Sequence, residues 1–359
     1  MFKSLKRSAK GAAVPHVKAT AGLPTVKMPV PEHVVIPMSM HIGAPAEPVV
    51  KKGDTVMVGT VIGKAGGFVS ANIYSSVSGT VQDIAPLRMV NGAMTTAVAI
   101  KTDGAQTVDP ACVPPVVTDK ASLLAAVQAC GLVGVGGAGF PTHVKLAPKD
   151  PSRIEYILVN GAECEPYITS DYRRMIEEPE KVVKGLQVIL TLFDSAKGYI
   201  CIEDNKPDCI AKMKELVKDI DRIEVKEVMT KYPQGGERTL IYAATGREIN
   251  SSMLPADVGC VVDNVETVIS VYRAVILGRP VNSRVVTMSG DGIKEPKNLL
   301  VLSGTDMSEL VDAAGGLKAK IAKAISGGPM MGFALYDLHV PCTKTTSAFL
   351  FLEHDAVSE

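Results

Sequence analysis

Short apolar strands alternate with helix-forming segments between residues 118 and 280, and this alternation constrains the fold more than any other feature. Strand-like runs occupy residues 154–160, 198–204 and 223–229, and another ends at Asp263. Strands that are separated by helices usually pair in parallel, and a parallel sheet needs helices on both faces. The pattern therefore predicts a Rossmann-like α/β domain with a mainly parallel sheet.

Composition excludes several classes of protein. The 359 residues include 38 Lys and Arg against 38 Asp and Glu, and a nucleic-acid binder would normally carry a basic excess. The seven cysteines include no CxxC pair, so we expect neither a metal site nor an iron–sulfur cluster among these residues. No apolar run approaches the ~18 residues that a membrane-spanning helix needs. The chain is thus predicted to be a cytoplasmic protein without a membrane span.

Residues 33–110 consist of short β-like runs separated by Gly and Pro, which predicts a small all-β domain. The turn at 53–54 and the Ser-Gly pair at 78–79 resemble the hairpins of the lipoyl and biotinyl carrier fold, a barrel-sandwich hybrid. A carrier needs a lysine at the hairpin tip, where Phe68 stands, and Lys64 comes too early. We therefore predict the carrier fold without the carrier chemistry.

Three further segments complete the predicted organisation. Residues 1–32 are basic and then rich in Pro and Ala, and they read as an irregular lead-in. Residues 283–340 have the proportions of a β-grasp domain of the SLBB type. Residues 341–359, with the apolar run 347–352, form a C-terminal segment.

The glycine-rich segment 134–139 is the most distinctive motif. Gly134, Gly136, Gly137 and Gly139 let a backbone adopt positive φ and approach a planar or phosphorylated ligand closely. Lys145 follows and offers a mobile charge for a phosphate. No strand directly precedes the segment, so it is not the dinucleotide-binding fingerprint of Rossmann folds. A tight loop without a ligand remains the alternative.

A second motif, Asn160 to Glu165, follows a predicted strand. Ligands of parallel sheets bind beyond the carboxyl ends of the strands, where Asn160 would offer a donor and an acceptor. Glu163 and Glu165 could accept hydrogen bonds from ribose hydroxyls, although a solvated acidic turn is the alternative. Acidic neighbours raise the pKa of a thiol, so Cys164 is predicted to be passive.

Two helix N-termini supply the remaining candidates. Gly235 and Glu237 precede one helix, and Asp263 and Asn264 lie between a strand and another helix. Backbone N–H groups at such ends are suited to binding phosphate. Each residue could instead be a simple N-cap.

Together, the segments GVGGAGFPTHVK, VNGAECEPYITSDYR, GGE and DNVET resemble the flavin- and NADH-binding subunit of respiratory complex I. The chain is more similar still to the C subunit of the Rnf electron-transport complex, from about residue 33 to residue 352. The resemblance implies a noncovalent FMN that oxidises NADH and passes electrons towards ferredoxin. It also implies partner subunits of the Rnf complex and a peripheral place on the cytoplasmic side of the membrane.

The resemblance assigns site residues position by position, with no catalytic side chain because the cofactor carries the chemistry. The implied FMN-binding residues are Gly134, Gly136, Gly137, Lys145, Asn160, Glu163, Gly235, Glu237, Asp263 and Asn264. Phe140 and Glu165 fall on positions that face NADH. The chain departs from the complex I pattern at Val135, Ala162 and Gly236, which weakens the NADH assignments more than those of FMN.

Two alternatives remain at this level. Related flavoproteins that reduce corrinoids or serve amino-acid reductases share this core. The other alternative is a non-catalytic scaffold like the A subunit of the sodium-pumping NADH:quinone reductase, although the intact glycine segment and Asn160 disfavour it.

The Rnf family continues into a ferredoxin-like domain that holds 4Fe-4S clusters. We expect those clusters only there, and expect this chain to be a truncated form or a naturally short relative.

Overall fold

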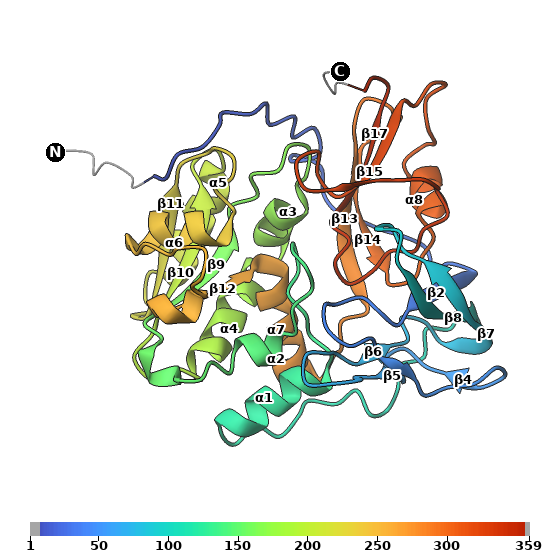
Figure 1. Ribbon diagram of the computed structural model, residues 1–359, viewed down its shortest axis with the longest axis horizontal. Helices are drawn as coiled ribbons and strands as arrows, with labels where there is room; N and C mark the ends of the chain where they lie inside the picture. The colour runs from blue at the N-terminus through green and yellow to red at the C-terminus, as the bar shows by residue number, and fades with distance from the viewer. Residues whose placement is uncertain (1–7, 356–359) are drawn as a thin grey trace.

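The computed structural model describes residues 8–355, and its central unit is built on a four-stranded parallel sheet (Figure 1). The strand order is β11-β10-β9-β12, and all three pairings are parallel. The bounds are β9 Tyr156–Gly161, β10 Lys197–Glu203, β11 Ile223–Val228 and β12 Cys260–Asn264. The sequence-based prediction of a parallel α/β sheet is confirmed.

Helices cover both faces of this sheet because successive strand residues point to opposite sides. Ile157 and Val159 face one core, whereas Leu158 between them faces the other. The first core is covered by α1, α4, α5 and α7, and the second by α6. The helices are α1 Lys120–Ala129, α2 Thr142–Lys145, α3 Ser170–Glu177, α4 Pro179–Leu190, α5 Pro207–Val217, α6 Glu237–Thr245 and α7 Val265–Leu277.

Local signals set several of these helix ends. Asp119 accepts a hydrogen bond from the backbone N–H of Ser122 and so caps α1. Gly131 follows α1 with a φ of +63°, which suits a residue without a Cβ. Pro179 divides the helical stretch into α3 and α4, since proline has no N–H to donate and is tolerated in a first turn.

The N-terminal module is a pair of small sheets packed face to face. One sheet has the order β2-β8-β7-β4 and the other β3-β5-β6, and apolar side chains such as Ile36, Ile62 and Ile100 fill the space between them. The bounds are β2 His33–Pro37, β3 Glu47–Pro48, β4 Thr55–Val56, β5 Val61–Lys64, β6 Ile73–Tyr74, β7 Gly79–Arg88 and β8 Met94–Thr102. The arrangement agrees with the predicted barrel sandwich.

The C-terminal unit is a six-stranded sheet with the order β1-β14-β13-β17-β15-β16, accompanied by helix α8, Met307–Ala313. Its strands are β1 Val26–Lys27, β13 Ser283–Ser289, β14 Lys297–Leu302, β15 Lys323–Ser326, β16 Phe333–Ala334 and β17 Ala348–Leu352. The sheet extends beyond the segment 283–340 at both ends. Phe349 and Phe351 are fully buried. The apolar run 347–352 therefore belongs to the core of the C-terminal unit.

The N-terminal lead-in is irregular, as expected, but it is tied to the rest of the molecule. It runs along the central unit before it reaches the C-terminal sheet (Figure 1). Ala12 and Tyr232 exchange two backbone hydrogen bonds of 2.8 Å, and the carbonyl of His16 accepts one from Tyr167. The lead-in therefore acts as a strap across two units.

All three units meet at one buried lysine. The ammonium group of Lys344 donates to the carbonyls of Asn72 in the N-terminal module (2.6 Å) and Gly131 in the central unit (2.7 Å). Burial lowers the pKa of Lys344 to about 7, from an ordinary value of 10.5. The two backbone carbonyls hold the side chain in place without a carboxylate.

Replacing Lys344 by methionine should change how stability depends on pH. Between pH 7 and 10 the unfolded chain binds more protons at this lysine than the folded chain, so the free energy of unfolding of the native protein rises with pH. Relative to Lys344→Met, the native protein should gain about 2 kcal/mol between pH 7.5 and 9. Urea titrations at both pH values measure this. The exposed Lys149→Met serves as control, and parallel pH dependences for native protein and Lys344→Met would refute the assignment.

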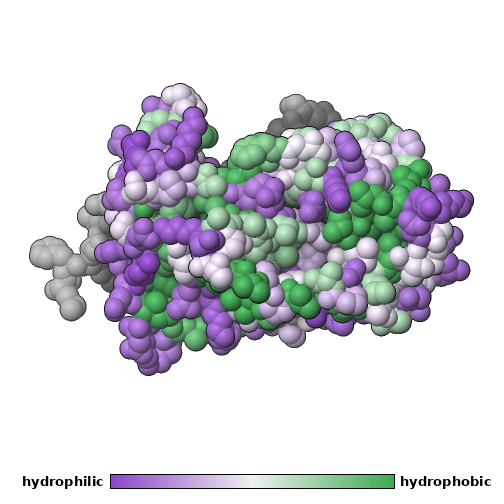
Figure 2. Space-filling view, turned by 90° about the horizontal axis from the view of Figure 1, so that it is seen from below, coloured by the Kyte–Doolittle hydropathy of each residue, from purple (hydrophilic) through white to green (hydrophobic). Residues whose placement is uncertain are grey.

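No helix within residues 8–355 is long and apolar enough to cross a membrane. On the face drawn in Figure 2, apolar side chains gather in small patches that are separated by hydrophilic ones.

Candidate functional site

Three of the sequence motifs meet where β9 and β12 end. Asn160 and Asn264 are register partners at the carboxyl ends of these adjacent strands. The side-chain amide of Asn160 donates to the carbonyl of Gly235 at 2.8 Å, which brings the segment before α6 to the same place. This is the edge of a parallel sheet where ligands bind.

The glycine loop lies against the beginning of α7. Gly134 donates to the carbonyl of Phe140 (2.7 Å) and closes the loop, while the N–H of Val135 donates to Oγ1 of Thr267 (2.9 Å). Gly136 and Gly139 have φ of +78° and +73°, so the expectation of positive φ holds at these two positions. Residues 136–138 are exposed, which leaves their backbone accessible to a ligand.

Two glycines show where a ligand could approach. A Cβ at Gly136 would lie 3.2 Å from Nδ2 of Asn264, so the loop sits directly on this amide. A Cβ at Gly137 would meet nothing within 4 Å. The loop is therefore open at Gly137, next to the position where Gly136 contacts the amide of Asn264.

Lys145, at the end of α2, lies within the site, but its partners are acidic. Its ammonium group donates to the carbonyl of Val262 and lies 3.2 Å from Oε1 of Glu237 and 3.8 Å from Oδ1 of Asp263. Burial raises the pKa of Asp263 to about 6, and Lys145 partly offsets this. The lysine thus offsets part of the negative charge of two carboxylates, in addition to any role towards phosphate.

Glu163, in the acidic segment after β9, is buried and contacts the start of α3. One carboxylate oxygen of Glu163 accepts hydrogen bonds from the N–H of Asp171 (2.9 Å) and the hydroxyl of Ser170 (3.4 Å) at the start of α3. Burial raises the pKa of Glu163 to about 7, and the nearby Lys18 moderates the effect. At neutral pH this carboxyl group is therefore close to its titration point.

Glu165 and Cys164 differ in their surroundings. Oε2 of Glu165 accepts a hydrogen bond from the N–H of Met330 (3.2 Å), which belongs to the C-terminal unit. Cys164 is buried, and its sulfur accepts from the N–H of Gly235 (3.3 Å). Burial is the main cause of the raised pKa of Cys164, ahead of the acidic neighbours, which supports the predicted passive role. Phe140 contributes its carbonyl to the glycine loop, and no hydrogen bond within residues 8–355 joins it to Glu165.

Several buried polar atoms in or next to these motifs have no hydrogen-bond partner within the part of the chain that the structure describes. They are Oδ1 and Oδ2 of Asp263, Oε2 of Glu163, Oε1 of Glu165, and both side-chain polar atoms of Gln234. Buried polar atoms are nearly always hydrogen-bonded, so these atoms are available to partners that a bound group could supply. Carboxylates accept hydrogen bonds, and the ribityl hydroxyls and ring N–H of FMN would donate them. The residues present therefore fit FMN.

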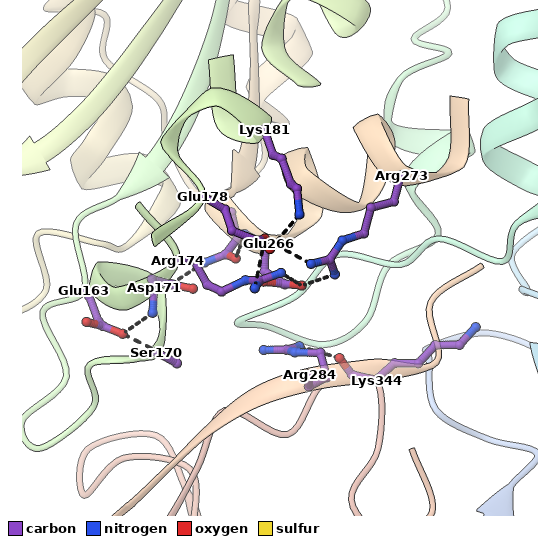
Figure 3. A network of polar contacts seen from close by, with 11 residues as sticks. Glu163, Ser170, Asp171, Arg174, Glu178, Lys181, Glu266, Arg273, Arg284 and Lys344 are labelled. Atoms are coloured by element: carbon purple, nitrogen blue, oxygen red, sulfur yellow. Dashed lines mark hydrogen bonds and ion pairs between the residues drawn. The ribbon is translucent and has the colours of Figure 1, made fainter. Parts of the chain in front are cut away.

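Sequence reasoning missed several residues that hold the site together. The amide of Asn264 donates to Oδ2 of Asp171 (2.6 Å), and Glu266 behind it is buried with Arg174 (2.5 Å) and Arg273 (3.3 Å). Figure 3 shows Glu163 bonded to the start of α3 and Glu266 of α7 with its two arginines, while Arg284 is bonded separately to Lys344. The acidic first turns of α3 and α7 were visible in the sequence, but their pairing partners are about 90 positions away.

The chain matches three family models. They are the RnfC barrel sandwich hybrid domain over residues 6–105, the Nuo51 FMN-binding domain over 127–273 and the SLBB domain over 285–334. The chain is 45% identical over 349 residues to the C subunit of a proton-translocating ferredoxin:NAD(+) oxidoreductase complex of Clostridium ljungdahlii, and covers 75% of that protein and 95% of itself. This chain belongs to the RnfC family.

A second relative supports this family, and a solved structure is similar in fold alone. The C subunit of the Na(+)-translocating ferredoxin:NAD(+) oxidoreductase complex of Acetobacterium woodii is 42% identical, over 94% of this chain and 77% of the relative. A crystal structure of an NAD+-reducing [NiFe]-hydrogenase is similar in fold, with a TM-score of 0.52 and 21% identity over 65% of this chain and 47% of the other. The predicted combination of barrel sandwich, FMN-binding α/β domain and SLBB domain is thus confirmed.

Proposed function

We propose that this chain binds FMN noncovalently at the ends of β9 and β12 and oxidises NADH there. One observation carries the proposal: the glycine loop packs on the amide of Asn264 and is open at Gly137, while Asp263, which precedes Asn264, and Glu163 have buried carboxylate oxygens with no hydrogen-bond partner among the described residues. When bound, FMN takes up two electrons from NADH and releases them singly, which suits transfer to iron–sulfur clusters.

The residues of the chain bind and orient rather than transfer protons. The exposed backbone of 136–138 lets planar rings approach closely. Asp263 and Glu163 accept hydrogen bonds from hydroxyl and N–H groups. Lys145 balances the charge of Asp263 and Glu237 and is the cation of the site for a phosphate. Glu165 and Phe140 are proposed to face NADH.

Relatives are named as subunits of ferredoxin:NAD(+) oxidoreductase complexes. We infer that the other Rnf subunits are the partners, with ferredoxin reached indirectly and a peripheral place on the cytoplasmic side of the membrane. Within residues 8–355, no group of three or more His, Cys, Asp or Glu could hold a metal ion. From the resemblance to the Rnf family, we propose that the 4Fe-4S clusters belong to a ferredoxin-like domain.

The experiment adds FMN to the purified chain, follows quenching of FMN fluorescence, and then adds NADH without oxygen. FMN should bind and bleach, and ferricyanide should restore its colour. Lys145→Ala should weaken FMN binding by about 1–3 kcal/mol, the scale of a hydrogen bond to a charged group, whereas the exposed Lys149→Ala should not. Bound FMN that stays oxidised in excess NADH would favour the scaffold alternative, and absence of FMN binding would end the proposal.

A further inference from the structure

The ammonium group of Lys18, in the N-terminal strap, is enclosed by the main chain of the acidic loop. It donates to the carbonyls of Glu163 (2.9 Å), Glu165 (2.8 Å) and Ile168 (2.5 Å). An ammonium group has three donors and no acceptor, so every donor is used on this single loop. Three carbonyls that converge on one point would repel each other without a cation between them.

The same strap also holds the loop at its turn. Tyr167 has a φ of +70°, an unusual value for a residue with a side chain, and its N–H donates to the carbonyl of His16 (2.9 Å). Thr20, two residues beyond Lys18 in the strap, contacts Thr169 through their hydroxyls (2.5 Å). The strap thus follows the loop from Glu163 to Thr169.

This loop carries both acidic side chains of the proposed site. Oε2 of Glu165 is held from the other side by the N–H of Met330, while its Oε1 has no partner among the described residues. Glu163 is fixed at the start of α3, where Asp171 in turn accepts from Asn264. The position of the loop backbone therefore sets where both carboxylates lie.

We infer that Lys18 is a positioning residue of the site: by gathering three carbonyls of the loop, it places Glu165 for NADH and Glu163 for FMN. The inference rests on the proposed function. It extends the site to the N-terminal strap, about 145 positions away in the sequence. Its three hydrogen bonds all go to main-chain carbonyls of the loop, so Lys18 acts through the loop.

A merely structural role would have different consequences. If Lys18 only attached the strap, its loss would reduce the fraction of folded chains and hence kcat per chain, but the remaining folded chains would bind NADH normally. A positioning role instead raises KM for NADH while kcat changes little. The two roles are therefore separated by kinetics.

The test compares Lys18→Met with Lys27→Met, which replaces an exposed lysine of the same strap. In the FMN-loaded chain, with ferricyanide as acceptor, Lys18→Met should raise KM for NADH at least tenfold and change kcat less than twofold. It should weaken FMN binding about threefold or more. Lys27→Met should match the native protein. Lys18→Gln, a neutral donor with two N–H groups, should raise KM three- to fivefold and decides the question if Lys18→Met does not fold.

Hydrogen exchange of the cofactor-free chain provides a readout that does not depend on NADH. The amide of Thr169 donates to Oγ1 of Thr287, outside the strap, and should exchange at least tenfold faster in Lys18→Met or Lys18→Gln than in Lys27→Met. Unchanged exchange, or an unchanged KM in a native protein that oxidises NADH, overturns the inference. A native protein that binds no FMN would instead refute the proposed function, and the exchange result would still decide whether Lys18 positions the loop.

Discussion

Glu266→Gln is expected to destabilise the central unit by about 3–5 kcal/mol, the scale for removing one partner of a buried ion pair. Glu266 is buried at the start of α7 and contacts the guanidinium groups of Arg174 and Arg273. A neutral amide would leave the two cations with Glu178 as their one remaining carboxylate partner among the described residues, so one positive charge at this largely buried place would lose its compensation. Urea unfolding followed by circular dichroism measures the loss.

The matched control is Glu215→Gln, which removes a carboxylate from an exposed pair with Lys218. Exposed pairs contribute about 0–1 kcal/mol, so this variant should unfold almost as the native protein does. Equal effects of the two substitutions would show that the buried network in Figure 3 does not stabilise the fold.

The effect of Glu266→Gln should also depend on pH. Burial alone would raise the pKa of Glu266, but Arg174, Arg273 and Arg284 together hold it below its ordinary value of 4.5. A carboxyl group with a depressed pKa in the folded state stabilises above its unfolded pKa, and this contribution disappears as pH falls through the folded pKa. The difference between native protein and Glu266→Gln should therefore be full at pH 7 and shrink below about pH 4.

The parallel sheet was predictable because short apolar strands alternate with helical segments, and local residues such as Asp119, Gly131 and Pro179 mark where helices begin or end. These signals are local, since capping and proline chemistry act within one turn. The order of the strands was not predictable in the same way. It places β9 between β10 and β12, which depends on how helices pack on the two faces.

The site was predictable as a set of motifs but not as a set of contacts. Asn160 and Asn264 meet because both end parallel strands, which follows from topology. In contrast, Lys18 in a Pro- and Ala-rich lead-in has no local signal that assigns it to the loop after β9. The partners of Lys145 were also not predictable. Its positive charge is evident from the sequence, but its pairing with Glu237 and Asp263 depends on the relative positions of α2, α6 and β12.

Gly139→Ala is expected to destabilise the protein by about 3 kcal/mol, because two costs add. A side chain at a φ of +73° costs about 1–2 kcal/mol, and overpacking a filled space costs about 1–3 kcal/mol. The added Cβ would lie 2.9 Å from Cα of His41 and 3.2 Å from Cγ2 of Thr345. Because these atoms belong to the N-terminal module and the C-terminal unit, the substitution should loosen the junction of all three units.

Gly137→Ala, two positions earlier, should separate ligand binding from stability. Its Cβ would meet nothing within 4 Å, so the free energy of unfolding should stay within about 0.5 kcal/mol of the native value or rise slightly, since alanine restricts the unfolded chain. The same methyl group would enter the open space that we assign to FMN and should weaken FMN binding about tenfold. Gly139→Ala should lower both stability and FMN binding. Native FMN affinity in a stable Gly137→Ala variant would show that the ligand does not approach the loop at this position, and the FMN site would then have to lie elsewhere along the ends of β9 and β12.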